Sequence, residues 1–240
     1  MDLTSYLALS RQMVLDRHMT VVATNLANAG TTAYRAEHTR FARVLERAGG
    51  SRPVAFVQDA ALIRDLDPGP VTQTGNPLDL ALVGPGYFAF ATPEGTRYGR
   101  AGRLELDASG RLVDVDGHAL LDASGNPIVL PADARPITVA SDGTISGRGG
   151  PIARIGIHAF AREEALTRIG SGLYESAESP APAQGARVVQ GALEGSNVQP
   201  VLEMTTMLET VRAFESAQRL LDTQHELERQ AIEKTVRASG

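Results

Sequence analysis

Two long helical patterns lie at the two ends of the chain, and they constrain its fold more than any other feature. The first pattern covers Leu3–Ala27, where Leu15, Met19, Val22 and Leu26 recur at spacings of four, three and four residues along one helix face. The second covers Val198–Val236. Its apolar seam alternates spacings of four and three residues, as a heptad does, and comprises Ala213, Ala217, Leu220, Gln224, Leu227 and Ala231.

Such narrow apolar stripes are costly to expose to water, so we expect the two helices to pair with each other or with copies of themselves. Two ordinary amphipathic helices packed on a globular core are the alternative. Gly30 follows the first helix and is expected to take the left-handed conformation there. Ser196-Asn197 offers a capping oxygen before the second helix, and Pro200 lies in its first turn.

The chain between the helices has a different pattern, which begins at Asn76. Short apolar runs alternate with turn residues such as Gly84-Pro85-Gly86, Asp116-Gly117 and Asp142-Gly143. This spacing predicts an antiparallel β domain. The linker-like stretch Ser179–Ala183 ends it.

Shorter segments carry weaker signals. Thr39–Arg47 is read as a second helical patch that Gly49–Pro53 ends, and Arg162–Ile169 as a short helix. Strands are expected at Val54–Val57 and at Arg187–Leu193.

These elements predict an α+β fold in which paired, coiled-coil-like N- and C-terminal helices flank a central antiparallel all-β domain. Residues 1–35 and 196–240 are expected to form the helical domain, and residues 76–183 the β domain. Residues 36–75 and 184–195 are expected to connect these two domains.

Composition excludes several classes of function. The net charge of −5 and the pI of about 5.6 disfavour nucleic acid as a partner, because phosphate binding needs a basic surface. The absence of cysteine excludes disulfides, zinc–thiolate sites and thiol nucleophiles. No apolar run is long enough to insert into a membrane. The N-terminus lacks a basic region, and Arg11 and Arg17 interrupt the apolar run that a signal peptide needs.

No arrangement of residues predicts catalysis, a cofactor or a metal. The histidines lack metal-ligand spacing, and there is neither a nucleophile elbow nor a phosphate-binding loop. The acidic stretches that begin at Asp107, Asp114 and Asp122 do not have calcium-loop spacing, so we interpret them as hairpin turns. We therefore expect a protein that is not an enzyme.

Three segments resemble the bacterial flagellar basal-body rod proteins, in particular the proximal members. The first is Val21–Arg35, with its Asn25 and Asn28 pair. The second is Thr74–Phe88, continued by Tyr98–Gly102, and the third is Leu193–Val198 with the helix that follows. Two residues depart from the family pattern, because Ala33 stands where the family usually has glycine and Pro85 where it usually has aspartate.

The resemblance implies a structural subunit of the proximal rod. Such subunits polymerise through their terminal helices into the drive shaft that transmits torque from the motor to the hook. The implied partners are copies of the chain, other rod and hook proteins, and the flagellar type III apparatus, which would export it from the cytoplasm to the periplasmic rod without a cleaved signal peptide. The candidate subunit-interface residues are Leu15, Met19, Val22, Asn25, Leu26, Asn28, Tyr34, Val211, Phe214, Leu220 and Leu227.

Two other functions are possible. A distal rod or hook-type subunit would carry the same end signatures. A β-domain enzyme or ligand-binding module with a helical oligomerisation stalk would instead need a pocket with converging polar groups.

Overall fold

The computed structural model describes residues 3–46 and 54–238. Contacts divide the chain into two compact units, which are considered separately. The helix–hairpin unit comprises Met1–Ala27, Ala36–Asp65 and Gln199–Gly240, and the β unit comprises Asn28–Arg35 and Leu66–Val198. The predicted α+β class is confirmed by two helices and many antiparallel strands.

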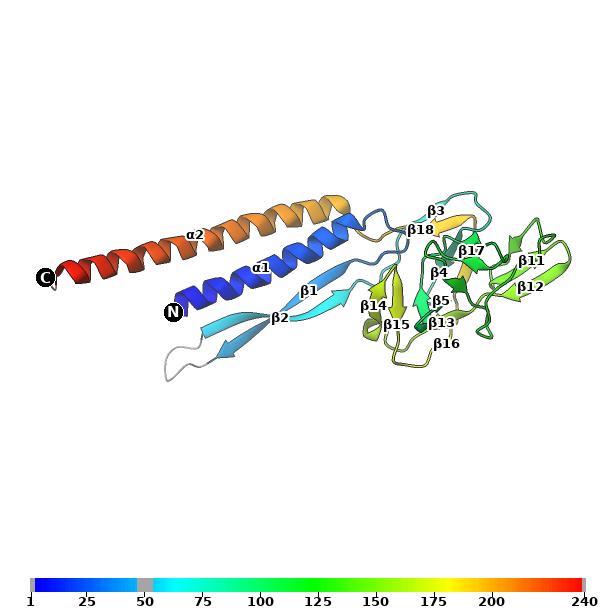
Figure 1. Cartoon of the computed structure of the whole chain (residues 1–240), viewed down its shortest axis with the longest axis horizontal. Coiled ribbons are helices and arrows are strands. Elements are labelled where there is room, and N and C mark those ends of the chain that lie inside the picture. The colour runs from blue at the N-terminus through cyan, green and yellow to red at the C-terminus, as the bar shows by residue number, and fades with distance from the viewer. Residues whose placement is uncertain (1–2, 47–53, 239–240) are drawn as a thin grey trace. The chain divides into compact units, whose positions relative to one another are not determined.

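The helix–hairpin unit consists of two long helices and two long strands. Helix α1 covers Leu3–Ala27 and α2 covers Pro200–Ala238. They contact each other and run antiparallel, with both chain ends at the same end of the pair (Figure 1). Helix α2 begins two residues later than predicted, at Pro200, whose missing N–H is harmless in a first turn.

Strands β1 (Glu37–Glu46) and β2 (Val54–Arg64) form an antiparallel hairpin that contacts α1. The helical patch predicted at Thr39–Arg47 is therefore wrong. Nine residues are too few for apolar spacing to separate a helix from a strand, and the long ladder with β2 supplies the backbone hydrogen bonds instead. The residues expected to end that patch, Gly49–Pro53, lie outside the described residues.

The β unit contains the remaining strands, and its largest sheet has the central order β14-β15-β6-β5-β9-β8-β7. Strand β13 pairs with β5 and β16, while β10-β11-β12, β17-β4 and β18-β3 form smaller sheets. The bounds are β3 Val71–Gln73, β4 Leu80–Val83, β5 Tyr87–Thr92, β6 Gly95–Gly99, β7 Glu105–Leu106, β8 Leu112–Val113, β9 Ala119–Leu120, β10 Thr138–Val139, β11 Thr144–Gly147, β12 Gly150–Arg154, β13 Ile157–Ala159, β14 Thr167–Gly170, β15 Leu173–Glu175, β16 Ala181–Pro182, β17 Arg187–Gln190 and β18 Ala192–Glu194.

Two of the shorter predictions have different outcomes. The extended segment at Arg187–Leu193 is confirmed and forms β17 and β18. The helix predicted at Arg162–Ile169 is wrong beyond a single 3₁₀ turn at Glu163–Ala165, because β14 begins at Thr167 and pairs with β15.

Three turns in the main sheet share one geometry. The Oδ1 atoms of Asp107, Asp114 and Asp122 each accept backbone N–H groups two and four residues further on, at 2.8 to 3.0 Å. The backbone N–H of Arg111 holds the pKa of Asp107 below its usual value. The prediction that these acidic stretches are turns is confirmed, since each carboxylate closes its own loop.

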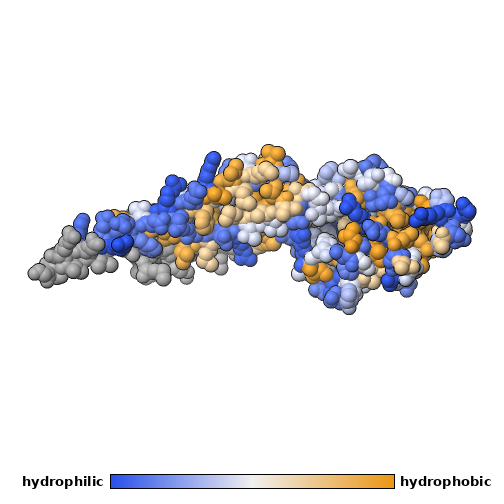
Figure 2. Space-filling model, turned by 45° about the horizontal axis from the view of Figure 1, so that its top comes forward, coloured by the Kyte–Doolittle hydropathy of each residue, from blue (hydrophilic) through white to orange (hydrophobic). Residues whose placement is uncertain are grey.

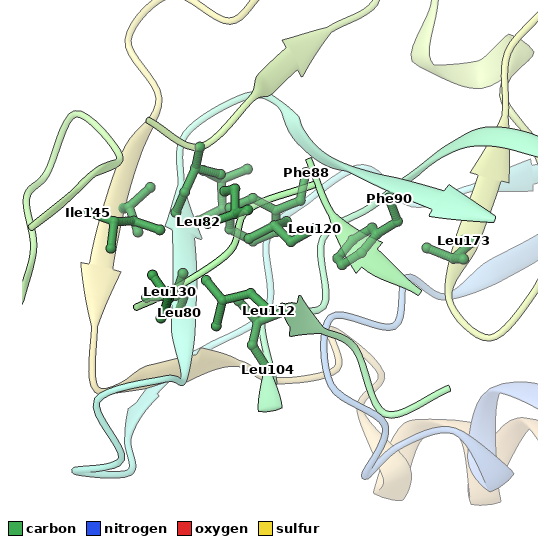
Figure 3. Close-up of a cluster of buried hydrophobic side chains, with 13 residues drawn as sticks. Leu80, Leu82, Phe88, Phe90, Leu104, Leu112, Leu120, Leu130, Ile145 and Leu173 are labelled. Atoms are coloured by element: carbon green, nitrogen blue, oxygen red, sulfur yellow. The ribbon is translucent and has the colours of Figure 1, made fainter. Parts of the chain in front are cut away.

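Two apolar clusters fill the β unit. The larger joins leucine, isoleucine and valine side chains from most strands to Phe88 and Phe90 (Figure 3). The smaller contains Tyr87, Tyr98 and Tyr174, with Phe160 edge-on to the first two. The strands predicted from short apolar runs therefore carry their own core.

Truncating a central residue of the larger cluster tests its contribution. Leu120 is 0% exposed, so Leu120→Ala is expected to lower the free energy of unfolding of the β unit by about 3 kcal/mol, through lost burial and the cavity left behind. Urea unfolding followed by the near-UV circular dichroism of the tyrosines measures it. Val115, 65% exposed, is the control, and Val115→Ala should change stability by less than about 0.5 kcal/mol. Equal effects of the two changes would contradict this assignment of the core.

Candidate subunit interface

The side chain of Asn25, in the last turn of α1, joins α1 to both of its neighbours. Its amide nitrogen donates to the backbone carbonyl of Glu37 at 2.8 Å and to Oε1 of Glu203 at 3.3 Å. Its amide oxygen accepts the backbone N–H of Glu37 at 3.0 Å. Because Asn25 is 1% exposed, these bonds fix how α1 meets β1 and α2.

The face of α2 that lies against its own unit has small or polar residues at its most buried positions and half-buried apolar residues, such as Met207 and Phe214, beside them. Its most buried positions are Thr210 and Ala217, seven residues apart, and half-buried Glu203 and Gln224 continue the heptad in both directions. The opposing face of α1 includes the buried Val22.

The small side chains leave space between the helices. A cavity of about 300 Å³ is lined by Ala8 of α1 and by Ser216, Ala217 and Leu220 of α2, among others. Polar groups also cross the seam, where the Gln12 side chain donates to that of Gln218. Polar contacts therefore contribute to the register of the helix pair.

The opposite face of α2 is apolar at its beginning. Val201 is 75% exposed, and Leu202, Met204 and Leu208 are each more than half exposed. We call these four residues the α2 apolar patch. Figure 2 shows hydrophobic side chains gathered on this part of the helix–hairpin unit. Exposed apolar residues gathered in this way are typical of a contact surface, so the α2 apolar patch is a candidate for one.

The signature loop that opens the β unit is tightly bonded. The Asn28 carbonyl and side chain accept from the backbone and hydroxyl of Thr31. Tyr34 is buried, and the Arg168 guanidinium lies 4.5 Å from its ring centroid. Gly30 does not have the positive φ that we expected. Ala33 has it instead, with φ of 54°, which explains why glycine suits position 33.

One cluster in the β unit has the composition of a metal site. Side-chain ligand atoms of Asp114, Asp116 and His118 lie within 4.8 Å of one another. Asp114 Oδ1 already accepts two backbone N–H groups, and Oδ2 lies 2.9 Å from Nδ1 of His118. The cluster is one of the repeated turns. Elsewhere, burial lowers the pKa of the His158 imidazole, which packs edge-on against Tyr98.

Both units match known protein families. Residues 189–233 match the family described as Flagellar basal body rod FlgEFG protein C-terminal, and residues 81–147 match the Flagellar hook protein FlgE/F/G D1 domain. The chain is 38% identical over 240 residues to the flagellar basal-body rod protein FlgF of Caulobacter vibrioides, with 98% of each chain covered. It belongs to the flagellar basal-body rod protein family.

Other members of this family are also similar over most of their length. The chain is 35% identical over 219 residues to FlgF of Mesorhizobium japonicum, with 90% of each chain covered. It is 31% identical over 250 residues to the flagellar basal-body rod protein FlgG of Bacillus subtilis, covering 92% of this chain and 95% of that one. Among the described residues, no helix is both long and apolar enough to cross a membrane.

The predicted subunit-interface residues occupy several environments. Val22, Asn25 and Tyr34 are buried within the chain, and Leu220 and Leu227 are 51% and 58% exposed. The other predicted interface residues are half-buried, namely Leu15, Met19, Leu26, Asn28, Val211 and Phe214. The structure brings Ala217 and Gln224 of the predicted seam to the inward face and leaves Leu220 and Leu227 outside. Their assignment to a subunit interface stays a prediction.

Sequence reasoning missed the α2 apolar patch. The signal was available, because Val201, Met204 and Leu208 recur at spacings of three and four residues.

Removing the Asn25 side chain tests its role in this rod-family helix pair. Asn25→Ala leaves the buried N–H of Glu37 without its side-chain partner, so it is expected to destabilise the helix–hairpin unit by about 2 kcal/mol. Thermal melting followed by the helical far-UV circular dichroism signal measures it. Thr24→Ala, at the neighbouring exposed position, is the control and should leave the melt nearly unchanged. Indistinguishable melts for the two variants would mean that Asn25 does not hold the helix end.

Proposed function

We propose that this chain is a structural subunit of the proximal flagellar rod, and that it polymerises through its terminal helices into the shaft that transmits torque from motor to hook. The observation that carries the proposal is the α2 apolar patch, Val201, Leu202, Met204 and Leu208. An isolated chain gains nothing from exposing these side chains, whereas neighbouring helices in an assembly would bury them.

The composition of the inner seam supports the same proposal. Its most buried positions, Thr210 and Ala217, carry small side chains, and the neighbouring cavity of about 300 Å³ leaves room for side chains of another subunit. The coiled-coil-like pairing of α1 and α2 would then be completed by neighbours in the rod. A contact between unlike patches on successive subunits generates an open helical array when its rotation does not close into a ring.

Membership of the family supports a proposal for partners and location. We propose that the chain assembles with copies of itself and with other rod and hook proteins. We further propose export from the cytoplasm through the flagellar type III apparatus, without a cleaved signal peptide, to the periplasmic part of the basal body. Its function would be mechanical, without catalysis, membrane insertion or nucleic-acid binding.

Two alternatives differ in their support. A distal rod or hook-type role draws on the similarity to the FlgG relative, although the identities of 38% and 35% to the two FlgF relatives favour the proximal rod. A ligand-binding module has less support. A cavity of about 540 Å³ in the β unit is lined by Asn76, Leu78, Ile137, two prolines and a single ionisable side chain, that of Arg135.

A charge placed in the outward face of α2 tests the proposal. Leu208→Asp and Leu227→Asp are expected to abolish rod assembly and motility, because an unpaired carboxylate buried between helices costs about 3–5 kcal/mol. Swimming and the recovery of the chain in isolated basal bodies are measured in a strain that carries only the variant. Near-UV circular dichroism of the purified variants should be unchanged, since both sites are more than half exposed in the free chain.

The control places the same charge at another exposed position of α2. His225→Asp should preserve swimming if that position faces solvent in the rod. Normal swimming of the Leu208→Asp strain would exclude the α2 apolar patch from the assembly contact.

A further inference from the structure

The β unit contains a buried cluster of three charged side chains. Nε of Arg100 lies 2.8 Å from Oε2 of Glu194, and Nη2 of Arg35 lies 3.8 Å from Oε1 of the same carboxylate. The side chains of Glu194, Arg100 and Arg35 are only 1%, 3% and 6% exposed. One carboxylate therefore compensates two buried guanidinium groups.

Backbone groups complete the cluster. Arg100 donates to the carbonyls of Leu82, Gly84 and Gly86 at 2.6 to 3.0 Å. The N–H of Gly69 donates to Oε1 of Glu194 at 3.3 Å. Glu194 belongs to β18, and these bonds join β18 to segments that are distant from it in sequence.

Arg35 adds a further segment, because its Nη1 donates to the carbonyl of Leu66. Arg35 ends the first stretch of the β unit, Leu66 begins the second, and Glu194 lies just before that stretch ends at Val198. Three of the four places where the chain enters or leaves the β unit thus meet around one carboxylate.

Backbone bonds connect the same three segments directly. Ala33 N–H donates to the carbonyl of Glu194 at 2.8 Å, Gly195 N–H to that of Pro70 at 2.8 Å, and Asn197 N–H to that of Tyr34 at 3.2 Å. A Cβ atom at Gly69 would fall 2.0 Å from the carbonyl oxygen of Gly195, so the two backbones could not approach this closely with any other residue.

We propose that Glu194 is an electrostatic latch that holds three chain connections of the β unit in fixed positions relative to one another, in the free chain and before any assembly. With the carboxylate charge removed, Arg35 and Arg100 are two buried cations that repel each other, and the segments that carry them separate locally. The apolar clusters do not depend on this carboxylate, so the rest of the β unit stays folded. This inference goes beyond the proposed function, because it does not require the chain to be a rod subunit.

Hydrogen exchange of the full-length chain tests the latch through Glu194→Gln, which removes the charge and keeps the shape. The amides of Ala33, Gly195 and Asn197 are expected to exchange on the order of tenfold faster, because their bonds lie in the connections. The amides of Leu112 and Ile128, which bond within the main sheet, should be unchanged. Faster exchange of both sets would make Glu194 a general stabiliser and overturn the proposal, as would no change in either.

The matched control is Glu175→Gln. Glu175 also pairs with an arginine, Arg97, at 3.0 Å, but its side chain is 51% exposed. Water screens such a pair, so both sets of amides should exchange as in the parent chain. Faster exchange of the connection amides in this control would overturn the assignment to Glu194.

A second variant decides the question if Glu194→Gln does not fold. Arg35→Met removes the bond to Leu66 and leaves the pair of Glu194 and Arg100 in place. Ala33 and Asn197 should then exchange faster while Gly195 stays protected, because only the Arg35 segment is released. Unchanged exchange at Ala33 and Asn197 would refute the latch.

Discussion

Hydrogen bonds made by one buried amide, that of Asn25, join α1 to β1 and to α2 in the helix–hairpin unit. Where two helices meet through Thr210, Ala217 and Gln224, hydrophobic burial alone specifies neither register nor orientation. The bonds from Asn25 to Glu37 and Glu203 supply that specificity.

The β unit, in contrast, is stabilised mainly by burial of apolar side chains. Its core is large, apolar and formed from its own strands, and its charged cluster around Glu194 lies at the chain connections. Burial of Phe88, Phe90 and Leu120 stabilises the sheet, while Arg35 and Arg100 decide where the connecting segments lie. The β unit thus has an apolar core of its own, and the helix–hairpin unit carries the exposed α2 apolar patch.

The sequence predicted the features that depend on local patterns. The bounds of α1 and the acidic turns could be read from residue spacing and from side chains that bond to their own backbone. The hairpin of β1 and β2 could not, because its strands are specified by pairing with each other, a contact that periodicity does not contain. Likewise, Arg35, Arg100 and Glu194 stand far apart in sequence, and nothing short of the fold brings them together. For α2, residue spacing predicted an apolar seam. Which seam residues face inward, as Ala217 does, and which are exposed, as Leu220 is, depends on how α2 packs against α1.

The repeated aspartate turns have a consequence for how the β unit folds. Because Asp107 and Asp114 close the connecting loops with their own side chains, β7, β8 and β9 pair in chain order across short connections, and Asp122 closes the turn after β9 in the same way. Contacts between residues close in sequence lower the entropy lost on loop closure, and chains rich in them fold fast. We therefore expect this meander to form early in folding, before β17 and β18 pair with β4 and β3.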